Sequence, residues 1–373
     1  MRADEGFANL GPAGGFGFYN GAMLLEGIFA AVPTPFYPDE RVYFRKVEAN
    51  MARYSRSLLA GMLVLGSTGE AVELDDSESR EVLRVAAEAT APEKVLIAGV
   101  ARESVRGTVD LAEAAAQFNY DAVLVRTPTY YAGQMTPAAV LHYFRTVADR
   151  SPLPVILYNI PQCVPYDIPV ELVAELAQHP NIIGIKDSSG KMPRMKSQIE
   201  LTRSAPRCAV TVTPVFEAVT SRMLAPATET GGTLISMGGL TGGTTVVTAP
   251  PAPKPKTRTK EVGFQVLTGS ASRLLESLEA GAAGAMLAFA ACAPQACQEV
   301  YLAWKDHDLK LAREKQERIA APSQRIGGEL GMSGVKYACD FNGYYGGRCR
   351  APLLPLTAKN RAEIEVLLAG IRN

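Results

Sequence analysis

Lys186 occupies a position where a lysine could act as a nucleophile. It follows the apolar run Asn-Ile-Ile-Gly-Ile at residues 181–185 and precedes a polar turn of Asp, Ser, Ser and Gly. A short apolar run bounded by turn residues predicts a buried strand, so Lys186 should end that strand. Burial drives a lysine toward its neutral form, and a neutral amine can form a Schiff base with a ketone. Taken alone, Lys186 could also end a strand and point into solvent, since lysine is seldom buried.

Other predicted strands also end in groups that could bind or transfer charge. One apolar run leads into Gly-Ser-Thr-Gly-Glu at residues 66–70. The glycines permit a tight turn, and the hydroxyls of Ser67 and Thr68 with free backbone N–H groups could hold a carboxylate. Tyr158 ends a further strand, and a phenol beside an amine can transfer protons. Each feature has a simpler explanation, because such turns often cap helices and a tyrosine often only packs its ring.

Together these groups predict a site for a 2-oxo acid. The turn with Ser67 and Thr68 would hold the carboxylate, and Lys186 would form an imine with the adjacent ketone. The imine would then accept the electrons of a carbon–carbon bond as it breaks. Gly269, at the end of another predicted strand, would let a small ligand approach the backbone.

The elements that must position these residues are those of an α/β barrel. Amphipathic stretches such as 77–89 and 108–118 separate eight short apolar runs, at residues 27–36, 61–66, 94–100, 121–127, 153–158, 181–186, 264–268 and 283–290. Hydrophobic strands that alternate with helices predict a parallel sheet, here closed into a (β/α)8 TIM barrel with its working residues at the C-terminal strand ends. A doubly wound open sheet is the alternative, but no Gly-x-Gly-x-x-Gly follows the first strand.

The remaining segments lie outside this repeating pattern. Residues 1–26 form a flexible extension, residues 27–291 the barrel, and residues 292–373 a C-terminal helical region with a long helix at 294–319 and further helices at about 325–341 and 357–370. Residues 204–261 interrupt the barrel, and their Gly/Thr-rich and Pro/Lys-rich composition predicts a disordered insertion. It leads into a strand, so it should lie at the N-terminal face, away from Lys186. A misassigned gene boundary, or a basic tail for a partner, is the alternative.

Composition excludes several classes of function. The 38 basic and 38 acidic residues give no net charge, so neither nucleic acid nor an anionic membrane is an expected partner. No apolar run approaches the roughly 20 residues of a spanning helix. Six cysteines and three histidines show no zinc spacing, so we expect no metal, no disulfide framework and no cofactor. A reducing, cytoplasmic setting is expected; a mitochondrial one stays open, although residues 1–26 fit a transit peptide poorly.

The strand-end motifs are similar to those of a known family. Residues 66–70, the Tyr-Asn-Ile-Pro at 158–161 and the Ile-Lys-Asp-Ser at 185–188 resemble the signatures of the dihydrodipicolinate synthase / N-acetylneuraminate lyase superfamily of class I aldolases. Within it, the strongest resemblance is to the 4-hydroxy-2-oxoglutarate aldolases, through residues 127–135, 178–182 and 343–352.

The resemblance implies roles for individual residues. Lys186 would be the Schiff-base lysine, Tyr158 the proton shuttle, and Ser67 and Thr68 the carboxylate-binding residues. Ser188 and Gly269 would contact substrate. Tyr130, which we favour over Tyr131, would supply a phenol to the site of a neighbouring subunit, so a homo-oligomer (a tetramer or dimer) is implied.

Two departures from the family pattern bear on the substrate. Dihydrodipicolinate synthases carry an arginine five residues after the tyrosine that corresponds to Tyr158, where this chain has Cys163, and residues 160–170 contain no arginine. Thr68 stands where the aldolase group has an amide, as in the neuraminate lyases, so the aldehyde half of the substrate stays open.

The resemblance therefore implies a carbon–carbon lyase that releases pyruvate from a 4-hydroxy-2-oxo acid, with 4-hydroxy-2-oxoglutarate giving glyoxylate as the leading candidate. A 2-keto-3-deoxy sugar-acid aldolase and a 4-hydroxy-tetrahydrodipicolinate synthase are the alternatives among enzymes. A catalytically inactive barrel that binds an oxo acid is the alternative outside them.

Overall fold

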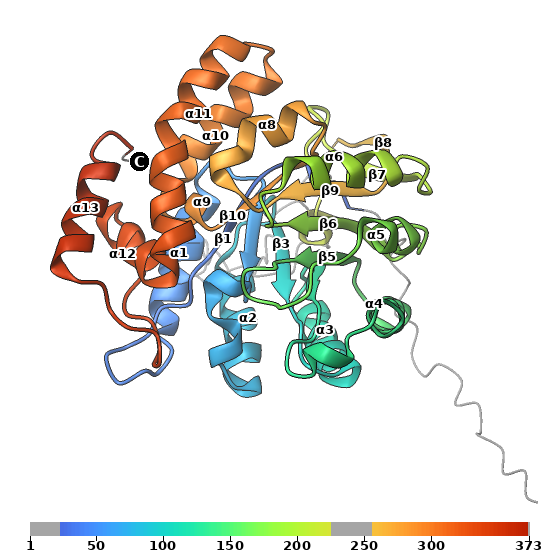
Figure 1. Ribbon diagram of the computed structural model, residues 1–373, viewed down its shortest axis with the longest axis horizontal. Coiled ribbons are helices and arrows are strands. Elements are labelled where there is room, and N and C mark those ends of the chain that lie inside the picture. The colour runs from blue at the N-terminus through green and yellow to red at the C-terminus, as the bar shows by residue number, and fades with distance from the viewer. Residues whose placement is uncertain (1–22, 225–255, 372–373) are drawn as a thin grey trace, which may run out of the picture.

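The computed structural model describes residues 23–224 and 256–371, and its centre is a closed parallel barrel (Figure 1). Neighbouring strands follow the order β1-β10-β9-β6-β5-β4-β3-β2 around the barrel. The strands are β1 (Gly27–Ala31), β2 (Gly61–Val64), β3 (Val95–Gly99), β4 (Ala122–Arg126), β5 (Val155–Asn159), β6 (Ile182–Asp187), β9 (Gln265–Thr268) and β10 (Gly284–Leu287). All eight predicted strands are present, and the TIM-barrel prediction is confirmed.

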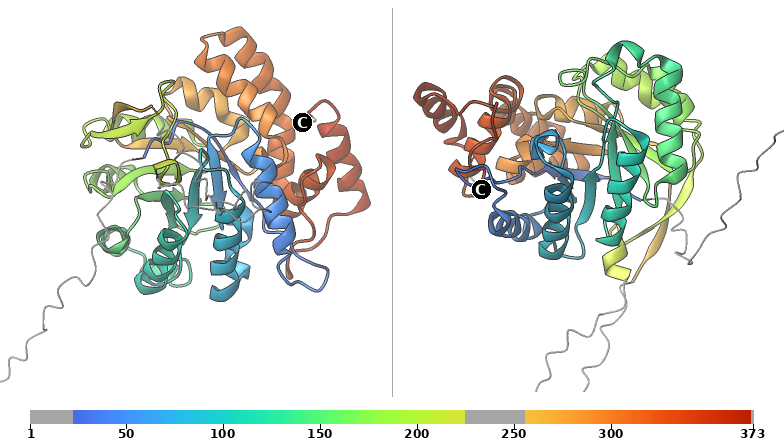
Figure 2. Two further views of the ribbon diagram at one scale, coloured as in Figure 1. Left: turned by 180° about the vertical axis from the view of Figure 1, so that it is seen from behind. Right: turned by 90° about the horizontal axis from the view of Figure 1, so that it is seen from below.

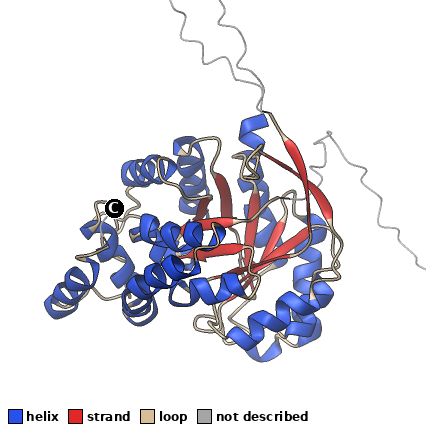
Figure 3. Ribbon diagram, turned by 90° about the horizontal axis from the view of Figure 1, so that it is seen from above, coloured by secondary structure: helices blue, strands red, loops and turns tan. Residues whose placement is uncertain are grey.

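Helices surround the barrel (Figure 3). They are α1 (Phe44–Ser55), α2 (Asp76–Ala89), α3 (Val105–Gln117), α4 (Pro137–Arg150), α5 (Val170–Leu176), α6 (Met192–Leu201) and α8 (Leu274–Glu279). Their N-termini follow local signals, because Asp75 and Glu78 form a reciprocal capping box on α2 while Ser104 and Thr136 cap α3 and α4. None of the helices in the described ranges is long and apolar enough to cross a membrane.

Two apolar cores result from the alternation of side chains along the strands. The inner core fills the barrel with residues such as Leu63, Leu124 and Ile156, and it includes Tyr158. The outer core lies between the strands and the helices, and Val123 and Val125 of β4 belong to it. A residue's position along a strand therefore decides whether its side chain enters the barrel or packs against a helix.

The C-terminal region differs from the prediction in its boundaries. The expected helix at 294–319 is two helices, α10 (Pro294–Lys305) and α11 (Leu309–Ser323), because the chain turns at His307, whose φ is 61°, and Asp308 caps α11. Preceded by the short α9 (Phe289–Cys292), α10 packs against β1 and α8 and completes the ring of barrel helices. The boundary thus falls after Lys305, and the appendage consists of α11, the π-helical turn η6 (Gln324–Glu329), α12 (Gly331–Phe341) and α13 (Ala358–Leu368).

The expectation of disorder across 204–261 is wrong for the flanks of that segment. Strands β7 (Cys208–Val212) and β8 (Arg258–Val262) pair in an antiparallel ribbon (Figure 2). Val210, Val212 and Val262 of this ribbon pack with Leu24 just before β1. The short helix α7 (Ser221–Leu224) contacts residues just before β3 and β4, because Ser221 donates to Asp121 and Arg222 to the Lys94 carbonyl. The described flanks of the segment therefore lie at the N-terminal face, as expected. Residues 225–255 and 1–22 lie outside the described residues.

Candidate active site

Lys186 and Tyr158 meet at the C-terminal mouth of the barrel. They are paired in register across β5 and β6, and the Lys186 Nζ lies 4.3 Å from the centre of the Tyr158 ring. Their exposed fractions are 3% and 5%, so both side chains are buried. The alternative of a solvent-facing lysine is therefore wrong, and the amine lies where a bound ketone would be shielded from water.

A polar network behind β6 fixes the end of that strand. Asp187 is buried and its carboxylate accepts hydrogen bonds from Arg194 Nε at 2.7 Å, Gln198 Nε2 at 2.9 Å and Asn159 Nδ2 at 3.2 Å. Asn159, the last residue of β5, also accepts the Ile168 N–H at 3.1 Å. Because successive strand residues face opposite sides, anchoring Asp187 outside directs Lys186 into the mouth.

Ser188 and Gly269 lie against each other beside Lys186. A Cβ at position 269 would lie 1.9 Å from the Ser188 Oγ, so the hydroxyl occupies space that only glycine leaves open. The Gly269 N–H donates to the Asp187 carbonyl at 2.7 Å, and the Ser188 N–H donates to the Asn159 carbonyl at 2.9 Å. These bonds join the ends of β5, β6 and β9 into one rigid rim.

Ser67 and Thr68 lie on the opposite wall of the mouth, after β2. They begin the single 3-10 turn η1 (Ser67–Gly69), which is fixed by the Gly69 carbonyl accepting from the Thr34 hydroxyl at 2.7 Å. Glu70 then adopts the left-handed conformation, with φ of 51°. Such a turn orients backbone N–H groups in one direction, which is the arrangement that binds anions.

The carboxylate of Glu70 ties this turn to the C-terminal region. It forms an ion pair with Lys336 of α12, with both side chains 1% exposed, and it accepts the Arg350 N–H at 3.0 Å. Lys336 also donates to the Arg348 carbonyl at 2.7 Å. Burial lowers the pKa of Lys336, and the negative charge of Glu70 opposes that shift. The pair could not be predicted from the sequence, since nothing in either segment indicates that residues so far apart meet.

Tyr130 and Tyr131 lie in the loop after β4 and point away from the barrel. Their exposed fractions are 80% and 62%, and their rings contact each other edge-on at 5.0 Å. Glu103 holds the loop by accepting the backbone N–H groups of Thr129 at 2.8 Å and Tyr130 at 2.9 Å. The structure therefore does not bring either phenol to Lys186 of the same chain.

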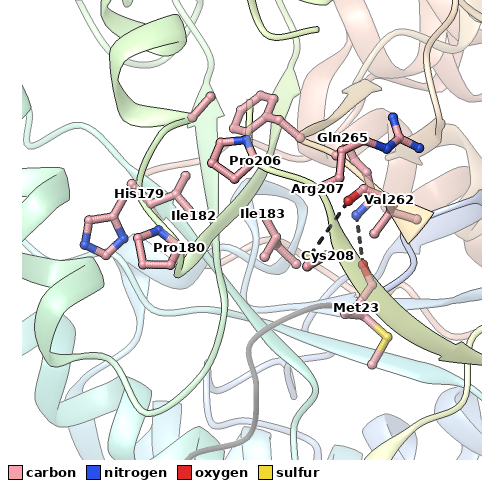
Figure 4. Close-up of a pocket in the computed structure, with 13 residues that line it drawn as sticks. Met23, His179, Pro180, Ile182, Ile183, Pro206, Arg207, Cys208, Val262 and Gln265 are labelled. Atoms are coloured by element: carbon pink, nitrogen blue, oxygen red, sulfur yellow. Dashed lines mark hydrogen bonds between the residues drawn. The ribbon is translucent and has the colours of Figure 1, made fainter. Parts of the chain in front are cut away.

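A pocket of about 240 Å³ lies at the other end of the barrel (Figure 4). Residues around the start of β6 and β9 and the β7–β8 ribbon line it, including Ile182, Cys208 and Gln265. Gln265 is occupied on both sides, since its Oε1 accepts the Leu25 N–H at 2.7 Å and its Nε2 donates to the Met23 carbonyl at 2.8 Å. The pocket lies beneath the ribbon and is not part of the candidate site.

Within the described ranges, no cluster of three or more His, Cys, Asp or Glu side chains could hold a metal ion.

Comparison with known proteins shows the family to which this chain belongs. The model of the "Dihydrodipicolinate synthetase family" matches residues 24–210 and 254–371, and the unmatched interval falls inside the segment that interrupts the barrel. A 4-hydroxy-tetrahydrodipicolinate synthase of Acidiphilium cryptum is 27% identical over 352 residues, covering 93% of this chain and 99% of that protein. YagE of E. coli K12, a member of the dihydrodipicolinic acid synthase family solved in complex with pyruvate, superposes with a TM-score of 0.73 at 24% identity over 93% of this chain and 99% of YagE.

Two fungal relatives are more similar over a shorter stretch. An L-threo-3-deoxy-hexylosonate aldolase of Hypocrea jecorina is 38% identical over 178 residues, covering 45% of this chain and 56% of that protein. A probable mitochondrial 4-hydroxy-2-oxoglutarate aldolase of Emericella nidulans is 36% identical over 183 residues, covering 47% and 59%. The chain belongs to the dihydrodipicolinate synthetase family of pyruvate-dependent lyases, and it is an aldolase of that family.

Proposed function

We propose that the chain cleaves 4-hydroxy-2-oxoglutarate to pyruvate and glyoxylate through a Schiff base on Lys186. The observation that carries this proposal is the buried contact between the Lys186 amine and the Tyr158 ring at the mouth of the barrel. An amine nucleophile of this kind needs a site shielded from water and a nearby group that moves protons. The burial of Lys186 supplies the first and the Tyr158 phenol the second.

The bond changes follow from those two groups. The Lys186 Nζ adds to the C2 ketone, and loss of water gives a protonated imine. Tyr158 donates its phenolic proton to the hydroxide that leaves as water, and its phenolate then takes the proton of the C4 hydroxyl as the C3–C4 bond breaks. Glyoxylate leaves and the electron pair of that bond forms an enamine. Protonation at C3 and hydrolysis of the imine then release pyruvate and restore the free amine.

The other predicted residues would hold the substrate in place. The turn of Ser67 and Thr68 faces the mouth across from Lys186, and it would bind the C1 carboxylate. The Ser188 hydroxyl, which occupies the space left by the missing side chain of Gly269, would contact the substrate beside the imine. The exposed Tyr130 would enter the site of a second copy of the chain, so the active form would be a homo-oligomer.

Two other activities have support in the same comparisons. The Hypocrea jecorina relative acts on a 3-deoxy sugar acid by its name, which favours a sugar-acid aldolase as the second candidate. The Acidiphilium cryptum relative is named a synthase, but Cys163 stands where those enzymes carry an arginine for the second substrate. A buried carboxylate without a partner costs several kcal/mol, so condensation with aspartate semialdehyde should be slow.

Pyruvate release from a panel of substrates tests the proposal. The panel contains 4-hydroxy-2-oxoglutarate, L-threo-3-deoxy-hexylosonate and 2-keto-3-deoxygluconate, with the condensation of pyruvate and aspartate semialdehyde measured in parallel. The highest kcat/KM should belong to 4-hydroxy-2-oxoglutarate. A higher kcat/KM for either sugar acid would identify the chain as a sugar-acid aldolase instead. Efficient condensation of pyruvate with aspartate semialdehyde would identify a synthase.

A further inference from the structure

Arg126 is a further cation at the mouth of the barrel, beside Lys186 and Tyr158. It is the last residue of β4, two positions after Leu124, which faces the barrel interior, so its side chain starts on the interior side of the sheet. In register it lies beside Tyr158 on β5, which in turn lies beside Lys186 on β6. The three side chains therefore leave the sheet at one level.

The Arg126 guanidinium is held in a way that leaves one edge available. Its Nη1 and Nη2 both donate to Glu103 Oε1 at 3.2 Å, and its Nη1 also donates to the Thr127 carbonyl at 3.0 Å. A guanidinium has five N–H donors, so the Nε–H and the second Nη2–H remain. These two lie on the same edge, and no bond from Nε is present among the described residues. Such an edge binds a carboxylate through two parallel hydrogen bonds.

Glu103, the carboxylate that binds Arg126, is itself held in place and ionised. Burial alone would raise the pKa of Glu103, but the N–H groups of Tyr130 and Thr129, together with Arg126, bring its pKa below the ordinary value. The carboxylate is therefore charged at neutral pH and orients the guanidinium before any ligand binds. The Arg126 side chain is 15% exposed, so its available edge lies in a partly desolvated place where charged hydrogen bonds are strong.

The Cys163 thiol is close to both Arg126 and Lys186. Burial raises the pKa of the Cys163 thiol, while the positive charges of Arg126 and Lys186 both act to lower it. Both cations are thus near one thiol in the loop after β5. Gln162, the residue before Cys163, is engaged elsewhere, because its Nε2 donates to the Ser188 carbonyl at 2.7 Å.

We infer that Arg126 binds the second carboxylate of the substrate and so selects dicarboxylic 2-oxo acids. Neighbouring strands are about 4.8 Å apart, and β5 lies between β4 and β6, so the backbones of β4 and β6 are separated by roughly 10 Å. A lysine and an arginine that extend from these two strands can both contact a short ligand between them. In 4-hydroxy-2-oxoglutarate the C5 carboxylate lies three bonds from the imine carbon. This inference rests on the proposed function. Arg126 lies on β4, whereas the arginine of the synthases follows the strand of Tyr158, so Arg126 would hold a carboxylate at a different place and would not replace that arginine.

The inference also separates the two leading substrate classes. A 3-deoxy sugar acid carries hydroxyl groups where 4-hydroxy-2-oxoglutarate carries its second carboxylate, and it would leave the Arg126 edge without an anion. Lysine in place of Arg126 would keep the charge but lose the two parallel bonds, so it should restore only part of the selectivity.

Imine trapping with two five-carbon probes tests this role without requiring cleavage. The probes are 2-oxoglutarate and 2-oxopentanoate, which differ in the distal carboxylate, and borohydride fixes whichever imine has formed. The unaltered protein should trap 2-oxoglutarate at much lower concentrations than 2-oxopentanoate. Arg126→Gln should raise the concentration needed for 2-oxoglutarate by on the order of a hundredfold and leave 2-oxopentanoate and pyruvate nearly unchanged. Arg126→Lys should fall between the two.

The control is Arg145→Gln, which removes an exposed arginine of α4 that pairs with Glu175 on the outside of the barrel. It should leave all three probes unchanged. Equal weakening of every probe by Arg126→Gln would show that Arg126 acts only by holding the β4 loop through Glu103, and no weakening at all would show that it does not touch the ligand; either result overturns the inference. Loss of the proposed function looks different, since the selectivity for 2-oxoglutarate would persist while 4-hydroxy-2-oxoglutarate was not cleaved.

Discussion

Tyr158 and Lys186 constrain each other, because each is the neighbour of the other across two paired strands and neither has room to leave the mouth. Strand-end reasoning could find both, since an apolar run and the turn after it show where a strand stops. Arg126 carries no comparable signal, because the family pattern points to an arginine after the strand of Tyr158 and Arg126 ends a different strand. Strand-end reasoning also could not orient Tyr130, whose partner would lie in another chain.

Tyr158→Phe should lower kcat by about 10²–10⁴-fold with a smaller change in substrate affinity, because it removes a proton-transferring hydroxyl and keeps the ring against Lys186. Steady-state kinetics with 4-hydroxy-2-oxoglutarate measures the effect. Tyr166→Phe is the matched control, since the Tyr166 hydroxyl has no hydrogen-bond partner within the described ranges. A normal rate in the Tyr158 variant would make Tyr158 a packing residue.

At the scale of elements, two contacts join segments that are far apart in the sequence. The Glu70–Lys336 pair connects the turn after β2 to α12, and the β7–β8 ribbon covers the N-terminal face of the barrel. The order of strands and helices could be predicted because each element has its own local periodicity. The ribbon could not, because three of the five residues of β8 are charged and it becomes a strand only by pairing with β7, about fifty residues earlier.

Lys336→Met should destabilise the fold by roughly 3–5 kcal/mol, because it leaves the Glu70 carboxylate buried without its counter-charge. Denaturant unfolding measures the loss, and the KM for the oxo acid should rise as the turn of Ser67 and Thr68 loosens. Adding Glu70→Gln should recover much of the stability. Lys305→Met, at an exposed position on α10, should change neither quantity. If the buried variant were as stable as this control, the pair would not hold the turn.

Val212→Ala should destabilise the protein by roughly 1–3 kcal/mol, because Val212 is fully buried in the core between the ribbon and Leu24. Val215→Ala, three residues later and 65% exposed, should have almost no effect. Thermal unfolding compares the two. Equal stabilities would mean that the ribbon does not pack against the barrel in solution. Because the ribbon lies far from Lys186, the activity of the folded variant should be unchanged.

In the molecule as a whole, the β4 loop is the part that the proposed function assigns to the site of a neighbouring subunit. Tyr130 and Tyr131 carry large aromatic rings into solvent, and exposed aromatic residues of this kind are typical of protein interfaces. The family resemblance of the sequence implies that a phenol of this loop serves a neighbouring subunit. In this chain, Glu103 holds the loop by accepting the Tyr130 N–H.

Mixing two inactive variants tests whether the site is shared. Lys186→Ala and Tyr130→Phe should each have low activity alone. Co-expression, or dissociation and reassembly of the two together, should restore activity, because mixed oligomers contain sites with an intact lysine from one subunit and an intact phenol from the other. The control mixes Lys186→Ala with Tyr158→Phe. Both residues of a site come from the same chain, so every site in this mixture keeps one lesion and activity should not recover. Absence of recovery in the Tyr130 mixture, with mixed oligomers demonstrated by mass, would show that Tyr130 does not serve a second subunit.

The most direct test of the account is to treat the protein with pyruvate and borohydride and to map the modified residue by mass spectrometry. We expect irreversible loss of activity and a single carboxyethyl group on the Nζ of Lys186, formed by reduction of its imine. Lys186→Ala and Lys186→Arg should acquire none and should not turn over substrate, since neither side chain can form the imine. Modification at another lysine, or full labelling of either variant, would contradict the assignment of Lys186 as the nucleophile.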